Sequence, residues 1–185
     1  MESIRKEKYY TYSDYAKWDD DERCELIDGV VYMMSPAPTR RHQNILGKLF
    51  IQFTSLLQGK PFKVYIAPFD VRLNAEEEDD IVVQPDLLVI CDKSKLTDEG
   101  SIGAPDLMIE ILSPSTAYKD KSIKFRKYLK YGVREYWMVD PLTDTIQACV
   151  LENGKYTISV YTVKDMAPVH ILGGGVIDVA EIFAE

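Results

Sequence analysis

A glutamate, Glu110, stands in the middle of a segment that otherwise has the composition of a buried β-strand. Residues 106–112 have the sequence Asp-Leu-Met-Ile-Glu-Ile-Leu. Alternation along a strand places Asp106, Met108, Glu110 and Leu112 on one face. A lone ionised carboxylate on a covered face costs several kcal/mol unless a cation or a hydrogen-bond donor compensates it. The segment is therefore either an edge strand with one solvated face or a strand that needs a partner for Glu110.

A second carboxylate, Asp86, precedes another apolar segment. It follows Pro85 and comes directly before residues 87–90 (Leu-Leu-Val-Ile), inside a predicted strand over residues 81–91. Because proline cannot donate to the hydrogen-bond ladder of a sheet, we expect the strand to bend or to lie at an edge at this point. Asp86 alone is typical of a turn. If the two strands are neighbours, Asp86 and Glu110 form an oxygen-rich site suited to Mg²⁺, which needs only one or two protein carboxylates.

The segment after Glu110 concentrates positive charge in an acidic chain. The chain has 22 Lys and Arg against 30 Asp and Glu, a net charge of −8, whereas residues 117–134 hold seven basic residues and one acidic residue. We expect a helix there, with Lys121, Lys124 and Tyr128 on one face. That face is either solvated or directed at the carboxylates.

Short strands alternate with helices along the rest of the chain. The apolar positions between His42 and Gln58 recur at every third or fourth residue, which predicts an amphipathic helix packed on a sheet. Turn and cap signals predict the other elements: a helix over residues 13–18, a hairpin over 25–34 turned at Asp28-Gly29, strands over 62–73 and 135–140, a basic helix that is capped by residues 113–116 and runs to about Tyr131, a hairpin of 146–151 and 155–161 turned at Asn153-Gly154, and a turn over 173–175. Without repeats, low-complexity segments or linkers, residues 1–185 are predicted to form a single domain of α/β or α+β class with a mixed sheet.

Composition excludes several classes of protein. A net charge of −8 and a pI near 4.9 exclude a uniformly basic, non-specific nucleic-acid binder. Apolar runs of no more than about five residues are too short to span a membrane, and the first residues contain no apolar signal region. Cys24, Cys91 and Cys149 are far apart and form no CxxC pair, which is typical of reduced thiols. We therefore expect a cytoplasmic protein with no membrane partner.

These residues together resemble the Uma-two (Uma2) family of restriction endonucleases, within the PD-(D/E)XK nuclease superfamily. The motifs that carry the resemblance are Pro85-Asp86, residues 110–116 (Glu-Ile-Leu-Ser-Pro-Ser-Thr), Asp120, Lys124, Tyr128, Gly132-Val133, Glu135-Tyr136-Trp137 and Asp140-Pro141, together with residues 25–29 (Glu-Leu-Ile-Asp-Gly), Ser35-Pro36 and His42. The resemblance covers about residues 10 to 183. It implies the restriction endonuclease-like fold, a mixed central β-sheet flanked by helices, here with an N-terminal β-hairpin and a C-terminal β-hairpin extension.

The resemblance also implies roles for individual residues. Asp86 matches the aspartate of the nuclease motif, and Glu110 matches the acidic residue of its second half. The lysine of that motif would fall at Leu112, which is apolar, and the matching lysine is Lys124 on the following helix. The complete set implied is catalytic Asp86, Glu110 and Lys124, supporting Glu25, His42, Asp120 and Tyr128, and a metal held by Asp86, Glu110 and the carbonyl of Ile111.

The implied activity is hydrolysis of phosphodiester bonds in DNA by an Mg²⁺-dependent endonuclease, with Mn²⁺ able to substitute. A lysine among carboxylates stays protonated, so Lys124 would orient the attacking water or stabilise negative charge. A homodimer would join two basic patches across one duplex. The alternative is a catalytically silent nuclease-fold module that binds nucleic acid or protein. The intact set of Asp86, Glu110 and Lys124 favours the enzyme.

Overall fold

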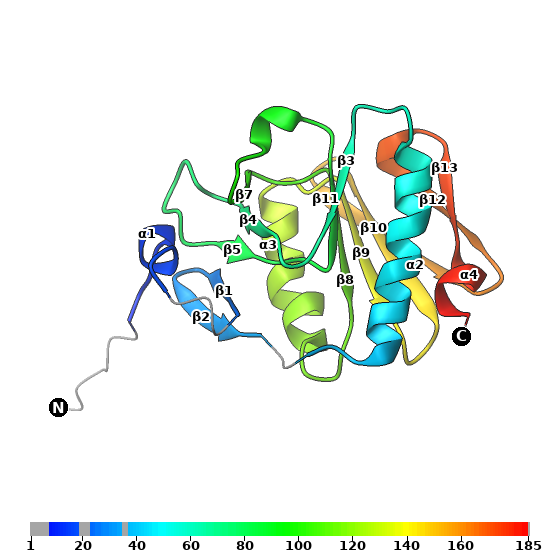
Figure 1. Cartoon of the computed structure of the whole chain (residues 1–185), viewed down its shortest axis with the longest axis horizontal. Coiled ribbons are helices and arrows are strands. Elements are labelled where there is room, and N and C mark those ends of the chain that lie inside the picture. Colours follow the sequence, from blue (N-terminus) through cyan, green and yellow to red (C-terminus); the bar gives the residue numbers. More distant parts are fainter. Residues whose placement is uncertain (1–7, 19–22, 35–36, 185) are drawn as a thin grey trace.

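The computed structural model describes residues 8–18, 23–34 and 37–184, and its largest element is a six-stranded sheet (Figure 1). In spatial order the strands are β11 (Lys155–Thr162), β10 (Thr145–Glu152), β9 (Glu135–Asp140), β8 (Leu107–Ile111), β6 (Leu87–Ile90) and β3 (Lys63–Ile66). β8 and β9 are parallel, and every other neighbouring pair is antiparallel. The predicted mixed central sheet is confirmed. β8 lies between two strands, so the alternative of a solvated edge strand for Glu110 is wrong.

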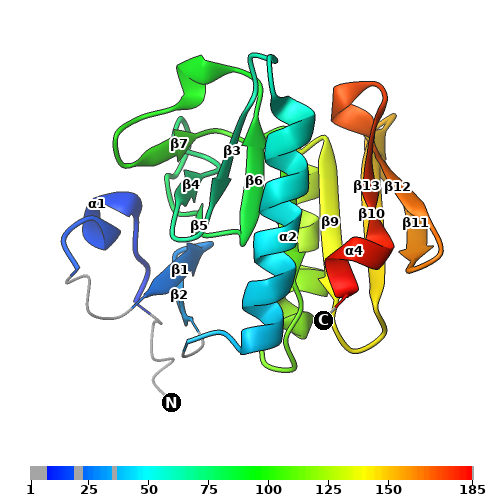
Figure 2. The same ribbon diagram turned by 45° about the vertical axis from the view of Figure 1, so that its right-hand side comes forward.

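Helical segments cover both faces of this sheet (Figures 1 and 2). They are α2 (Arg40–Leu57) on one face and, on the other, the π-helical segment η2 (Lys119–Lys124), which continues directly into α3 (Phe125–Lys130). Successive residues of a strand point to opposite faces. Ile109 accordingly shares a buried cluster with Phe53 of α2, whereas Met108 shares one with Tyr128 of α3. Glu110 therefore points to the same face as Met108, toward α3.

A second, five-stranded sheet packs against the α3 side of the molecule. In spatial order its strands are β2 (Val30–Met33), β1 (Cys24–Ile27), β5 (Val82–Val83), β4 (Asp70–Arg72) and β7 (Gly100–Ile102). Ile27, Val71 and Val83 belong to the same buried cluster as Tyr128 of α3. The predicted N-terminal hairpin is present, with Asp28 and Gly29 both at positive φ in its turn. It forms one edge of this sheet.

The chain crosses between the two sheets at two adjacent places. Residues 62–73, predicted as one strand, form β3 in one sheet and β4 in the other. The break falls at Pro68, which has no N–H to continue a ladder. Residues 81–91 divide in the same way into β5 and β6, as expected from the proline before Asp86. The Ala67 N–H donates to the Asp86 carbonyl oxygen at 3.1 Å, so Asp86 stands where the two sheets meet.

The C-terminal part extends the central sheet. β10 and β11 form the predicted hairpin around Asn153-Gly154, whose φ values of 49° and 76° suit a type I′ turn. β10 in turn pairs with β9. The remaining elements are α1 (Tyr12–Tyr15), η1 (Lys93–Lys95), β12 (Met166–Val169), η3 (His170–Leu172), β13 (Gly175–Asp178) and α4 (Val179–Phe183). In the described ranges, no helix is both long and apolar enough to cross a membrane.

Candidate active site

Asp86 and Glu110 lie together at the junction of the two sheets. In the antiparallel pair of β6 and β8, Leu87 is opposite Ile109, so the residue before β6 lies beside the end of β8. The Ile111 N–H donates to Asp86 Oδ2 at 2.7 Å. Glu110 is buried, whereas Asp86 is partly exposed. The two carboxylates therefore come from neighbouring strands.

Lys124 supplies the cation that a buried Glu110 needs. Its Nζ is 2.7 Å from Glu110 Oε1 and 2.7 Å from Glu25 Oε1, and its side chain is 3% exposed. Tyr128, one turn further along the helix, donates its hydroxyl to the same Glu110 oxygen at 2.9 Å. Two donors thus compensate the glutamate. The basic helix was predicted to present this face either to solvent or to the carboxylates. Lys124 and Tyr128 point at the carboxylates.

Glu25 brings the N-terminal hairpin into the same cluster. It is fully buried in β1, and besides Lys124 it accepts from Lys119 Nζ at 2.5 Å and from the Gln84 N–H at 3.0 Å. Neither Lys119 nor Gln84 was among the residues predicted for the site. Residues five apart lie about 140° around an α-helix, whereas the i→i+5 bonding of a π-helix aligns them. The π-helical geometry of η2 lets Lys119 and Lys124 both reach Glu25. A prediction based on α-helical periodicity could not place these two lysines together.

The predicted basic patch is largely neutralised within the chain. Lys121, expected beside Lys124 and Tyr128, lies instead on the exposed side of the helix with its Nζ 3.7 Å from Asp140, because the π-helical turn changes which residues share a face. Other basic side chains of residues 117–134 also pair with acids: Lys119 with Glu25, Lys127 with Asp28 and Arg134 with Asp106. On α2, Arg41 pairs with Asp144. Few basic groups of this helix are therefore left for phosphate groups.

His42 and Asp120 complete the surroundings of the cluster. His42, in the first turn of α2, has its Nε2 3.3 Å from Asp86 Oδ2, and Asp120 Oδ1 is 3.7 Å from Lys124 Nζ. His42 Nδ1 and Asp120 Oδ1 are buried and have no hydrogen-bond partner in the part of the chain that the structure describes. The structure thus brings together every residue predicted for the site: Asp86, Glu110, Ile111, Lys124, Glu25, His42, Asp120 and Tyr128.

Buried carboxyl groups outnumber the ammonium groups that face them. Burial raises the pKa of Glu110 well above its ordinary value, and with the neighbouring carboxylates it outweighs the opposing effect of Lys124. Burial also acts to raise the pKa of Glu25, but the two lysines it contacts lower it. Burial opposes the charge of Lys124, yet Glu110, Glu25 and Asp120 raise its pKa well above the ordinary value. These directions keep Lys124 and Glu25 charged and favour proton uptake by Glu110, and burial raises the pKa of Asp120 as well.

Two carboxylate oxygens at this site have no donor among the residues that the structure describes. Within the described residues, Asp86 Oδ1 and Glu110 Oε2 accept no hydrogen bond, since every contact of these side chains involves the other oxygen. The described ranges contain no group of three His, Cys, Asp or Glu side chains arranged around a metal position. Asp86 and Glu110 could supply two carboxylate oxygens to a divalent cation that keeps several waters, and such a cation would offset the excess of buried negative charge.

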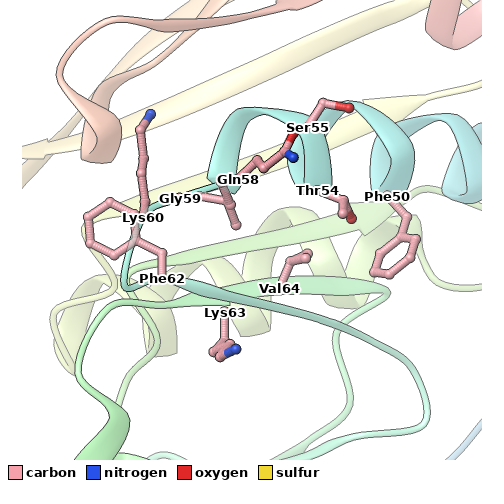
Figure 3. Close-up of a pocket in the computed structure, with 10 residues that line it drawn as sticks. Phe50, Thr54, Ser55, Gln58, Gly59, Lys60, Phe62, Lys63 and Val64 are labelled. Atoms are coloured by element: carbon pink, nitrogen blue, oxygen red, sulfur yellow. The ribbon is translucent and has the colours of Figure 1, made fainter.

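A separate hollow lies at the other end of α2 (Figure 3). It has a volume of about 660 Å³ and lies between the last turns of α2 and β3, with Phe50, Phe62 and Val64 among its lining residues. None of the residues predicted for the site lines it. The carboxylate cluster is therefore the candidate active site.

The fold of this chain is of the restriction endonuclease-like class. Its mixed sheet presents two carboxylates from neighbouring strands, and the following helix supplies a lysine. A solved structure described as a putative nuclease belonging to DUF820, from Anabaena variabilis, has the same fold. It superimposes with a TM-score of 0.75 over 94% of this chain and 97% of that chain. The two sequences are 19% identical, so this likeness is one of fold.

The sequence model of the Uma2 family, described as "Putative restriction endonuclease", matches residues 12–180. The chain therefore belongs to the Uma2 family, which confirms the resemblance of its motifs. Two proteins of Synechocystis sp. PCC 6803 are also similar. Protein slr1290 is 30% identical over 117 residues, 62% of this chain, and the match spans 60% of the length of slr1290. Protein sll1609 is 26% identical over 145 residues, 76% of this chain and 80% of that protein.

Replacing Glu110 by Gln is expected to stabilise the metal-free protein in a pH-dependent way. Because the folded state raises the pKa of Glu110, stability is lost as pH rises through that folded-state value and is fully present below the unfolded value, about 4.3. The variant should therefore melt higher than the parent at pH 8, by about 2–4 °C for each kcal/mol. The difference should shrink toward pH 4. A variant that melts lower at both pH values would show that Glu110 is a structural carboxylate.

Replacing Lys119 by Gln tests the π-helical turn. The change leaves the buried Glu25 with one lysine instead of two, which is expected to lower the free energy of unfolding by about 1–3 kcal/mol. Lys121→Gln, two residues away on the exposed side, is the matched control and should change it by less than about 0.5 kcal/mol. Urea unfolding followed by tryptophan fluorescence measures both. Equal effects of the two changes would contradict the contact between Lys119 and Glu25.

Proposed function

We propose that this chain is a metal-dependent endonuclease that hydrolyses phosphodiester bonds in DNA. The observation that carries the proposal is the contact of Lys124 with Glu110 beside Asp86. Hydrolysis of a phosphodiester needs an activated water and positive charge where negative charge develops, and these residue types supply both. Membership of a family described as restriction endonucleases supports the same chemistry.

Asp86, Glu110 and the carbonyl of Ile111 are the proposed metal ligands. We take the ion to be Mg²⁺, with Mn²⁺ as a substitute, because hard oxygen donors suit both. When bound, such an ion polarises a phosphate oxygen and lowers the pKa of its bound water. His42 and the Ile111 N–H both engage Asp86 Oδ2, which fixes the carboxylate and leaves Oδ1 for the cation.

Lys124 acts in this proposal as a fixed positive charge. The surrounding carboxylates raise its pKa well above the ordinary value, so it stays an ammonium group and does not serve as a general base. It would orient the attacking water or stabilise the charge that develops on the phosphate. Glu25, Asp120 and Tyr128 are positioning residues, because they touch Lys124 or Glu110.

A catalytically silent nuclease-fold module that binds nucleic acid or protein is the second candidate. The internal pairing of the basic helix favours it, because duplex binding draws on free Lys and Arg side chains. The complete set of Asp86, Glu110 and Lys124 favours the enzyme, because a binding module has no need of buried charge that is costly to keep. We place the protein in the cytoplasm, where Cys91 and Cys149, which are not in disulfides, stay reduced, and we propose a homodimer.

Cleavage of supercoiled plasmid and of labelled single strands, with Mg²⁺ or Mn²⁺, tests the proposed activity. Lys124→Ala and Glu110→Ala are each expected to lower the rate by about 10²-fold or more, since the first removes a positive charge aimed at the transition state and the second removes a proposed metal ligand. Lys121→Ala, on the exposed side of the same helix, is the control and should keep the parental rate. No activity on any substrate, or activity that is equal in all variants, would contradict the proposed site and favour the binding module; cleavage that needs no metal would contradict the metal dependence.

Metal binding can be measured without any substrate. Millimolar Mg²⁺ or Mn²⁺ should raise the melting temperature of the parent protein, because a ligand that binds only the folded state stabilises it. The apparent affinity should increase from pH 6 to pH 8, since Glu110, with its raised pKa, must release a proton to bind the ion. Asp86→Asn should remove the response. A metal response that persists in this variant would place the ion elsewhere.

A further inference from the structure

The six-stranded sheet ends on one side at an open edge strand, β11. It pairs with β10 over eight consecutive residues, from Lys155 to Thr162. No strand of the described ranges pairs with its other side. Figure 2 shows β11 at the right-hand border of the molecule. An edge of this length presents a row of backbone N–H and C=O groups that can pair with another strand.

The usual features that protect an edge strand are missing from the middle of β11. Such edges are normally kept short, bulged, or marked by proline or charged side chains. Residues 156–161 contain no proline and no charge, and their register with β10 runs without a bulge. Ile158 and Val160, on the same face, are 51% and 58% exposed. Val163 and Met166 are exposed as well. Four of the twelve exposed large apolar side chains of the described residues therefore lie between positions 158 and 166.

A second copy of the chain is the occupant that fits the charge of this edge. Each chain has a net charge of −8, so two copies repel each other unless they meet at a neutral surface. Residues 152–165 contain two acidic and two basic residues and are neutral. We propose that β11 pairs antiparallel with β11 of a second copy, about a two-fold axis through Ser159. The pairing would join the two central sheets into one.

The position of the axis follows from the side chains. A two-fold axis normal to the sheet keeps each side chain on its own face, so Ile158 lies opposite the partner subunit's Val160. Apolar pairs of this kind stabilise neighbouring strands. Ile158 is also opposite Cys149 of β10, which belongs to the buried cluster on the α3 side. The dimer would therefore continue an existing apolar face across the edge. This proposal does not rest on the nuclease activity.

Analytical ultracentrifugation of the full chain at micromolar concentration tests the interface. The parent is expected to sediment with twice its chain mass of 21.2 kDa, and Val160→Lys is expected to sediment as a monomer, because a charge in the middle of an edge strand prevents pairing. Ile51→Lys, at a 65% exposed position on α2, adds the same charge and should remain dimeric. A monomeric parent, or a dimer that survives Val160→Lys, would overturn the proposal.

Cysteine cross-linking tests the register without disturbing the fold. The axis puts Ser159 opposite the partner's Ser159, at the Cα separation of paired antiparallel residues, which a disulfide can bridge. Ser159→Cys should form a covalent dimer under mild oxidation. Thr157→Cys, two residues away on the same exposed face, should not, because the symmetry leaves the two copies of that position far apart along the strands. Cross-linking of both variants to the same extent, or of neither, would overturn this register.

Discussion

The buried ammonium group of Lys124 is the interaction on which the site and the packing around it depend. Such a group is costly to remove from water unless carboxylates surround it. Glu110 and Glu25 do so at 2.7 Å, and they belong to two different sheets. One charge therefore joins the basic helix, the central sheet and the N-terminal hairpin. The carboxylates need the lysine in turn, so removal of Lys124 would leave uncompensated negative charge in a closed interior, whereas neutralisation of Glu110 removes only the surplus.

The balance of charge in this cluster connects stability with chemistry. A set with equal numbers of carboxylates and lysines would be easier to bury, but it would offer nothing to a cation. The surplus carboxylate is held at Glu110, whose pKa is raised by burial and by the nearby charge of Asp86. Proteins often retain a locally unfavourable arrangement where it serves activity. The internal pairing of the basic helix follows the same pattern in part, because Lys119 and Lys124 act on buried carboxylates, whereas Lys127 pairs with the exposed Asp28.

Local apolar patterns predicted the central sheet, the hairpins and the two carboxylates, because a buried strand interrupted by Glu110 or by the proline before Asp86 is visible in the sequence itself. The resemblance to the family supplied Glu25 and His42, which no local pattern indicates. Lys119 was missed because a π-helical turn changes the phase of the helix. Residues 62–73 were predicted as one strand because the two sheets that divide them are defined by partners far away in the chain.

The separation of Glu25 and Lys119, 94 positions along the chain, determines when the site can form during synthesis. A ribosome adds about 5–20 residues each second, so Glu25 leaves it several seconds before the first lysine that binds it. In that interval the hairpin has its contacts with β5 and Gln84 but neither of its lysines, and the nascent polypeptide holds only part of the cluster. Whatever chemistry these residues perform starts only after the basic helix has emerged and docked. A chain whose translation stops before that point is inert.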